Sequence, residues 1–96
     1  MRDVDRIIEL VKGRFPTVVV EQLKVTHLAD DDGIWFFSLP PIRKDIQIES
    51  SNGMCPFLVE HDDMEETATE KLGVSVDRTV ELIAGYLLRV SPESAN

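Results

Sequence analysis

The segment from Asp45 to Asp63 predicts a β-hairpin, and this hairpin constrains the fold more than any other feature of the chain. Asn52-Gly53 lies between two runs of alternating apolar residues, and this dipeptide is the strongest short-range signal for a hairpin turn. Pro56 follows closely and has no backbone N–H to donate to a strand ladder. We therefore expect either a four-residue loop at 51–54 or an edge position for the strand that contains Pro56.

The register of this hairpin decides which side chains share a face. If the turn is centred on its Asn-Gly dipeptide, Ile48 pairs with Phe57. Ile46 then pairs with Val59, and one face of the hairpin is apolar throughout. The same register places Cys55 on this apolar face. Because unpaired cysteine is among the most often buried residue types, Cys55 is interpreted as a small core residue and not as a nucleophile.

The rest of the chain divides into segments with helical or strand-like periodicity. These patterns predict helices at 3–12, about 63–72 and 76–90, and strands at 17–28 and 34–39. Asp3 and Ser75 are expected to cap the first and last helices, and Gly73 is expected to end the short one. The apolar residues of the first strand change parity near Glu21, which predicts a bulge or bend there.

This order of elements predicts an α+β fold with the arrangement α-β-β-β-β-α-α. Short connections favour a four-stranded antiparallel meander, with an N-terminal helix and C-terminal helices packed on it. A chain of 96 residues has the size of one domain. We therefore expect a single α+β domain at 1–90, followed by a C-terminal tail at 91–96.

The strand at 34–39 is apolar on both faces, which is typical of an interior strand. If helices cover one face of the sheet, the other face keeps part of this apolar set, which is either Trp35, Phe37 and Leu39 or Ile34 and Phe36. Large apolar side chains rarely form a patch in contact with water. The second face should therefore meet either the short helix or a binding partner.

The charge of the chain excludes some functions. The formal net charge is −8 at pH 7, and six acids without any Lys or Arg lie between Glu60 and Glu70. Such a surface repels phosphate groups, so binding of nucleic acid is not expected. It attracts basic protein partners instead.

No apolar run approaches the ~20 residues of a membrane helix, so no membrane association is expected. The single cysteine excludes an intrachain disulfide and favours a reducing cytoplasm.

Candidates for metal binding or catalysis are few. His61 lies within an acidic run whose carboxylates are acceptable metal ligands. Alternation along a strand, however, directs His61 to the opposite face from Glu60 and Asp62. The spacings CxxC and HExxH are both missing from the sequence. We therefore expect no metal, no cofactor and no catalytic residue. The alternative is a small enzyme or metal-dependent protein built on Cys55, His61 and the neighbouring acids.

Three strings in the middle of the chain resemble those of small bacterial α+β proteins of unknown function. The strings are Gly33-Ile34-Trp35-Phe36, DIQIESS at 45–51 and CPFLVE at 55–60. This resemblance implies a bacterial α+β protein and assigns no role to any residue. By size and acidity the chain is also similar to toxin-neutralising immunity proteins and secretion chaperones, which both act by binding a protein.

These patterns together favour a non-enzymatic domain that binds a protein partner or a second copy of itself. An apolar sheet face would supply the anchors, and an acidic rim would steer a basic partner toward them. The predicted partner-binding residues are Trp35, Phe37, Glu49, Leu58, Glu60, Asp62 and Asp63. An immunity-type inhibitor or a chaperone of a basic protein is the more specific alternative.

Overall fold

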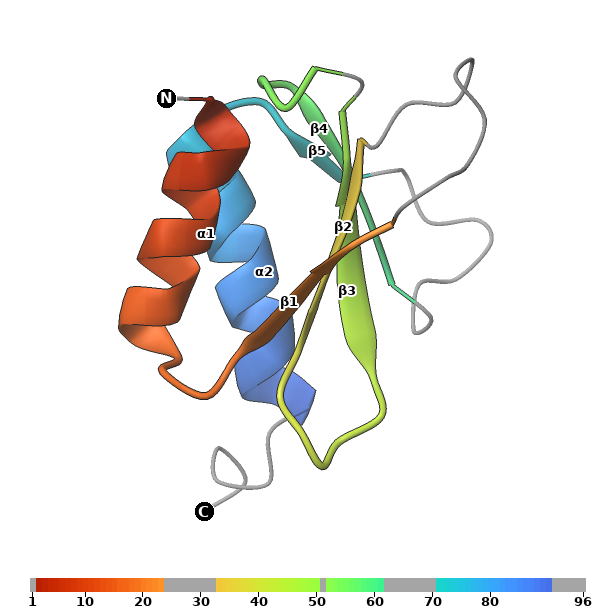
Figure 1. The fold of residues 1–96 in the computed structure, drawn as a ribbon. Helices are drawn as coiled ribbons and strands as arrows, with labels where there is room; N and C mark the ends of the chain where they lie inside the picture. The colour runs from red at the N-terminus through yellow and green to blue at the C-terminus, as the bar shows by residue number, and fades with distance from the viewer. Residues whose placement is uncertain (1, 24–32, 51, 62–70, 91–96) are drawn as a thin grey trace.

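The computed structural model describes residues 2–23, 33–50, 52–61 and 71–90 (Figure 1). Its elements are α1 (Asp3–Arg14), β1 (Val19–Gln22), β2 (Ile34–Ser38), β3 (Asp45–Glu49), β4 (Phe57–His61), β5 (Lys71–Gly73) and α2 (Val76–Val90). The predicted α+β class is confirmed, with five strands in the described residues where four were expected. The predicted tail at 91–96 lies outside the described residues.

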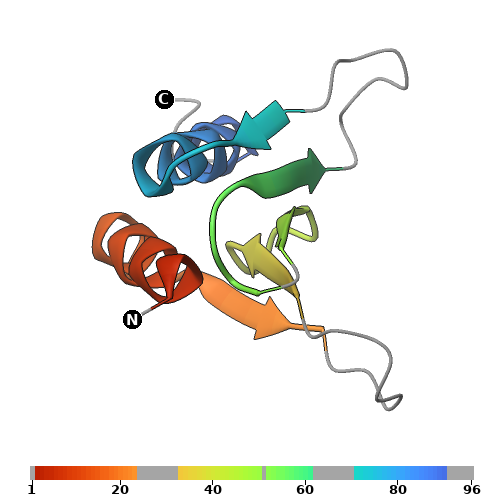
Figure 2. The same ribbon diagram turned by 90° about the horizontal axis from the view of Figure 1, so that it is seen from above.

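The five strands form one antiparallel meander in the order β1-β2-β3-β4-β5. Figures 1 and 2 show α1 and α2 side by side on the same face of this sheet. No described element covers the other face. Because the helices cover one face only, alternation along each strand separates a buried set of side chains from a set that faces away from the helices.

The hydrophobic core lies between the helices and the sheet. On the helix side, Ile7 of α1 and Ile83 of α2 are fully buried. On the sheet side, Trp35 contacts Phe57 edge to face, with ring centroids 6.4 Å apart. Burial of each large apolar side chain contributes about 1.5–3 kcal/mol, so this layer is the main source of stability for the fold.

The predicted register of the central hairpin is wrong by two residues. Ile48 pairs with Val59, and Ile46 pairs with His61. The shift by an even number keeps the same side chains on the core face, so the predicted face is correct. The cause is a longer connection, because β3 ends at Glu49 and β4 begins at Phe57.

Side chains within this connection organise it. The Ser50 hydroxyl donates to the Met54 carbonyl oxygen at 2.6 Å, and the Met54 N–H donates to Asn52 Oδ1 at 3.0 Å. Pro56 lies in the loop and therefore removes no donor from the ladder. The alternative edge position for its strand is wrong, since β4 lies between β3 and β5.

The N-terminus of α1 docks on the same loop. The Val4 N–H donates to the Gly53 carbonyl oxygen at 2.9 Å, and the Cys55 N–H donates to Asp3 Oδ2 at 2.9 Å. Asp3 is therefore not the N-cap that was predicted. It is the first residue of the helix, and its carboxylate binds the hairpin loop instead. Gly53 has φ +72°, and a Cβ there would come within 3.1 Å of the Val4 side chain, so glycine is required for both reasons.

The predicted helix at about 63–72 is wrong at its C-terminal end. Residues 62–70 lie outside the described residues, but Lys71–Gly73 form β5, in which Leu72 pairs with Leu58. Gly73 is accordingly a strand residue packed against α2, and not the end of a helix. α2 itself has the predicted bounds. Ser75 caps it as predicted, because the Ser75 hydroxyl oxygen accepts a hydrogen bond from the Arg78 N–H at 3.1 Å.

The bulge expected near Glu21 does not occur in the described part of the first strand. Val19–Gln22 pair without interruption with Trp35–Ser38, and the Leu23 N–H continues the ladder to the Ile34 carbonyl oxygen at 2.9 Å. The change of apolar parity has another explanation. Leu23 does not belong to the core and lies on the face away from the helices, where it is 39% exposed.

Candidate functional site

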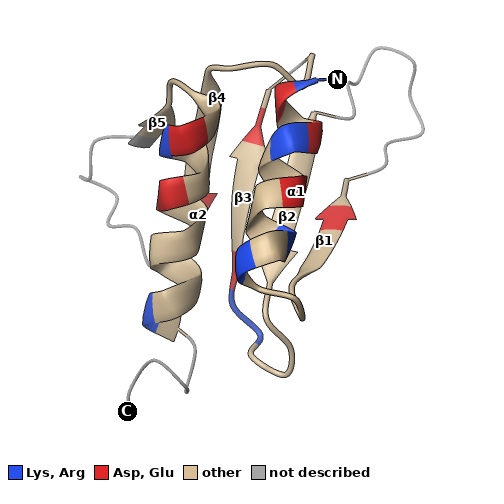
Figure 3. Ribbon diagram, turned by 90° about the vertical axis from the view of Figure 1, so that its left-hand side faces the viewer, with Lys and Arg blue, Asp and Glu red and all other residues tan. Residues whose placement is uncertain are grey.

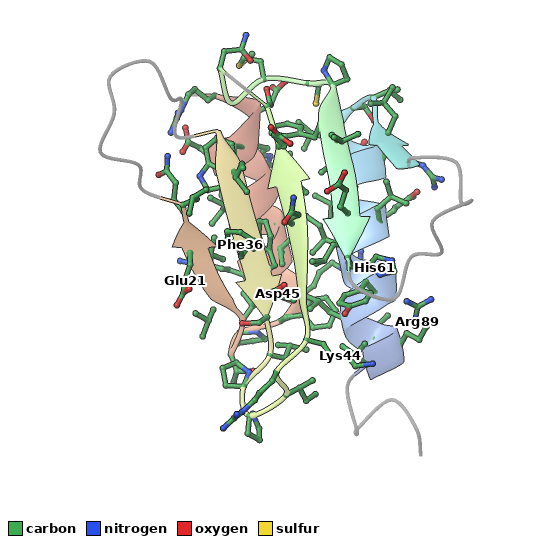
Figure 4. All side chains as sticks on the ribbon, turned by 90° about the vertical axis from the view of Figure 1, so that its right-hand side faces the viewer. Glu21, Phe36, Lys44, Asp45, His61 and Arg89 are labelled. Atoms are coloured by element: carbon green, nitrogen blue, oxygen red, sulfur yellow. The ribbon has the colours of Figure 1, made fainter. Side chains whose placement is uncertain are left out.

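The face of the sheet away from the helices is the strongest candidate for a functional surface, and we call it the open face (Figure 4). Strand pairing and alternation assign to it Val19, Glu21, Leu23, Ile34, Phe36, Ser38, Asp45, Gln47, Glu49, Leu58, Glu60 and Leu72. Side chains that pair across strands form rows that run at right angles to the strands. Two of these rows define the character of the surface.

The first row of the open face is mainly apolar. It runs from Leu23 through Ile34, Glu49 and Leu58 to Leu72. Ile34 and Leu58 are half-buried, and Leu72 is 48% exposed. The row thus contains four aliphatic side chains, one just beyond β1 and the others on β2, β4 and β5, and a single carboxylate on β3. A row of this kind offers anchors to a partner, because each Å² of apolar surface that is removed from water stabilises the complex by about 25 cal/mol.

The second row combines one aromatic residue with polar ones. Glu21 pairs with Phe36, Phe36 pairs with Gln47, and Gln47 pairs with Glu60. Gln47 Nε2 donates to Glu60 Oε2 at 3.2 Å, which orients that carboxylate across the strands. Figure 4 shows Glu21 and Phe36 on this surface over β1 and β2.

The open face has an acidic character. Its four carboxylates belong to Glu21, Asp45, Glu49 and Glu60, and among the described residues assigned to it there is no Lys or Arg. The basic residues of the described helices lie on the other side of the molecule (Figure 3). The open face therefore presents negative charge next to apolar side chains.

The residues predicted for partner binding do not all lie on the same surface of the protein. Glu49, Leu58 and Glu60 lie on the open face as expected, whereas Asp62 and Asp63 lie outside the described residues. Trp35 and Phe37 lie on the helix side and are 4% and 0% exposed.

The expectation that Trp35 and Phe37 form the exposed apolar set is therefore corrected. Their places on the open face are taken by Ile34 and Phe36. β2 is apolar at both parities, so no local signal in the sequence separates the two sets. Strand pairing decides which set of β2 faces the helices, because Trp35 pairs with Ile48, which is buried in the core.

Cys55 lies in the hairpin loop, half-buried beside the core. Burial, followed by a hydrogen bond to Asp3 and the negative charge of that carboxylate, raises the pKa of the Cys55 thiol from 9.0 to about 11. A nucleophilic cysteine requires a lowered pKa, since the thiolate is the reactive form. The surroundings of Cys55 therefore act against nucleophilic catalysis at this residue.

We expect the Cys55 thiol to titrate near pH 11 in the native protein and near pH 9 after unfolding. The folded pKa is the higher one, so the contribution of this thiol to stability is complete below about pH 9 and is lost as the pH rises to about 11. The ultraviolet absorbance of the thiolate measures the midpoint, with Cys55→Ser as the blank. Asp3→Asn should lower the midpoint. A native midpoint at or below 9 would contradict the assignment.

His61 is the last residue of β4 and packs against α2. Its ring stacks on Tyr86 with centroids 4.3 Å apart, and the Arg89 guanidinium carbon lies 5.4 Å from the centroid of the same tyrosine ring. Within the described residues, no group of three or more His, Cys, Asp and Glu side chains is placed to hold a metal ion.

Comparison with known proteins adds no identification. No protein-family model matches the chain, and no curated protein or solved structure matches it significantly. None of the helices in the described residues has the length and apolar character that crossing a membrane requires. Any functional conclusion therefore depends on the geometry and chemistry of the surfaces described above.

Proposed function

We propose that this protein is a non-enzymatic binding domain whose open face binds a basic protein segment that also carries apolar side chains. The observation that supports this proposal is the combination, on one sheet face, of an aliphatic row with four carboxylates and no described Lys or Arg. Apolar side chains of the partner would cover Ile34 and Leu58. Its basic side chains would meet Glu49 and Glu60.

Charge complementarity favours a basic partner over a second copy of the chain. A symmetric dimer through the open face would place the carboxylates of Glu21, Asp45, Glu49 and Glu60 opposite the same set from the other copy. Like charges placed together across an interface cost several kcal/mol. The formal net charge of −8 also opposes self-association. An immunity-type inhibitor or a chaperone of a basic protein would be a particular case of this function, and we expect it to act in the cytoplasm.

Selection from a random peptide library on phage, with the protein immobilised, tests the chemistry of the partner. We expect enrichment of peptides that combine Lys or Arg with aliphatic or aromatic residues, and binding that weakens as salt is added. Enrichment of acidic peptides, or of none, would contradict the proposal.

Paired variants then test the place of binding. Leu72→Ser should lower the affinity for a selected peptide by roughly tenfold, since one aliphatic anchor contributes about 1.5 kcal/mol or more to binding. Leu88→Ser is the matched control, because Leu88 is exposed to almost the same extent, at 47% against 48%, but lies on α2. Glu49→Gln and Glu81→Gln form a second pair that removes the same charge from the open face and from α2. Equal weakening by both members of a pair would place the binding site elsewhere.

A further inference from the structure

The aliphatic row of the open face has a definite length and direction. Its five positions are Leu23, Ile34, Glu49, Leu58 and Leu72, which follow one another across the sheet at right angles to the strands. Neighbouring strands lie about 4.8 Å apart, so the row is about 19 Å long. A track along any one strand of the described open face holds at most two apolar side chains. An elongated occupant therefore covers most apolar surface when it lies across the strands.

We propose that an amphipathic helix of the partner lies along this row, an inference that rests on the proposed function. A helix pairs its own backbone N–H and C=O groups. An extended segment on the same face would bury these groups against aliphatic side chains without partners, which is costly. One helical turn rises about 5.4 Å, close to the strand spacing, so successive turns can meet successive positions of the row. About 13–15 helical residues span the row.

Glu49 determines the chemistry of the middle of this helix. It is half-buried and lies between Ile34 and Leu58 in the row, with two aliphatic positions on either side. A carboxylate covered by an apolar side chain would lose water without gaining a partner. The helix should therefore carry Lys or Arg in its central turn and apolar residues in the turns on each side. Apolar residues at i, i+4, i+11 and i+14, with a basic residue at i+7, place all five side chains on one helix face.

Two further carboxylates lie on one side of the row. Glu21 and Glu60 each follow or precede a row member by two residues along their strands, about 7 Å away. Both belong to the second row of the open face, where Gln47 Nε2 donates to Glu60 Oε2 at 3.2 Å. Among the described residues assigned to this face there is no Lys or Arg to neutralise them. Additional Lys or Arg residues on one flank of the helix would therefore meet negative charge.

Two synthetic peptides of about 15 residues test the helix against an extended segment. Both contain the same Leu, Lys and Ala residues. One has the helical pattern given above, and the other places its Leu residues at every second position, the period of a strand. We expect the full chain to bind the helical peptide at least tenfold more tightly. The bound peptide should gain helical circular dichroism, because isolated helices of this length are only marginally stable. Equal or tighter binding of the alternating peptide would overturn the helix and leave the proposed function intact.

Exchange of the central Lys of the helical peptide for Gln tests its position opposite Glu49. Affinity for the parent protein should fall by about tenfold, since an interfacial hydrogen bond to a charged group is lost. Affinity for Glu49→Gln should change by less than about twofold, because the carboxylate is already gone. Glu81→Gln is the matched control, which removes the same charge from the exposed surface of α2 and should keep the tenfold preference. An equal loss in Glu49→Gln and in the parent would overturn the proposed placement.

Leu23→Ser and Leu72→Ser test the direction of the helix, because the two leucines lie at opposite ends of the row. They are 39% and 48% exposed, so both variants should fold. Each should lower the affinity for the helical peptide by about tenfold. A loss at one end only would overturn the direction across the strands. Binding of neither peptide would overturn the helix, whereas the proposed function is tested separately by the phage selection.

Discussion

Replacing Phe37 by alanine should destabilise the domain by about 3–5 kcal/mol, whereas the same change at the adjacent Phe36 should cost only about 1 kcal/mol. Phe37 is fully buried between the sheet and the helices, and its removal leaves a cavity in the core. Phe36 is half-buried on the open face, where the loss of its ring exposes little new surface. The two variants share the same chemistry and differ only in the face of β2.

Urea unfolding of the two variants measures this difference. We expect the unfolding midpoint to fall strongly for Phe37→Ala and slightly for Phe36→Ala, with similar denaturant dependence, because both should remain two-state. In thermal unfolding each 1 kcal/mol corresponds to roughly 4–8 °C for a domain of this size. Equal losses for the two variants, or the larger loss at Phe36, would show that the assignment of the open face is wrong.

Replacing Gly73 by alanine is the second large effect that we expect, with a loss of about 1–3 kcal/mol from overpacking. A Cβ at this position would collide with Thr79 Oγ1 and would lie 3.0 Å from Thr79 Cβ. Thr79 cannot move aside easily, because it is fully buried and its hydroxyl donates to the Ser75 carbonyl oxygen at 2.8 Å. β5 and α2 must therefore separate to admit the new methyl group.

A double-mutant cycle with Thr79→Ala distinguishes this mechanism from the loss of a helix-ending glycine. Thr79→Ala removes the hydroxyl and methyl groups that a Cβ at Gly73 would meet, so the double variant should lose less stability than the sum of the two single variants. Residues in contact show coupling of about 0.5–3 kcal/mol, and independent sites add. Strict additivity would indicate that Gly73 acts through its backbone conformation, as the helix prediction required. Gly13→Ala is a control, since nothing lies within 4 Å of a Cβ there.

Much of the fold could be predicted from local patterns. α2 has the expected bounds, because its apolar stripe, the Ser75 cap and Pro92 beyond its end all agree. The face of the central hairpin was also predictable, since alternation survives a shift of two residues. The register was not, because the loop length depends on contacts of Asp3 and Val4 with Gly53 and Cys55, which lie about fifty residues away in sequence.

The candidate site could be predicted only in part. Glu49, Leu58 and Glu60 were expected on the surface of the sheet, because β3 alternates between polar and apolar side chains and hairpin pairing extends that assignment to β4. β2 does not alternate in this way, so Trp35 and Phe37 could not be separated from Ile34 and Phe36. β5 was missed for a related reason, since three residues with only one large apolar side chain, Leu72, have too short a pattern to identify a strand.

Local sequence patterns were enough to predict the fold class, the bounds of α2, the faces of β3 and β4, and the acidic character of the chain. Each of these depends on periodicity or composition within a short segment. The tertiary structure alone decided the face of β2, the existence of β5 and the hairpin register. These depend on which strand pairs with which, and on where α1 and α2 bury apolar surface, so they follow from contacts between segments that no local pattern contains.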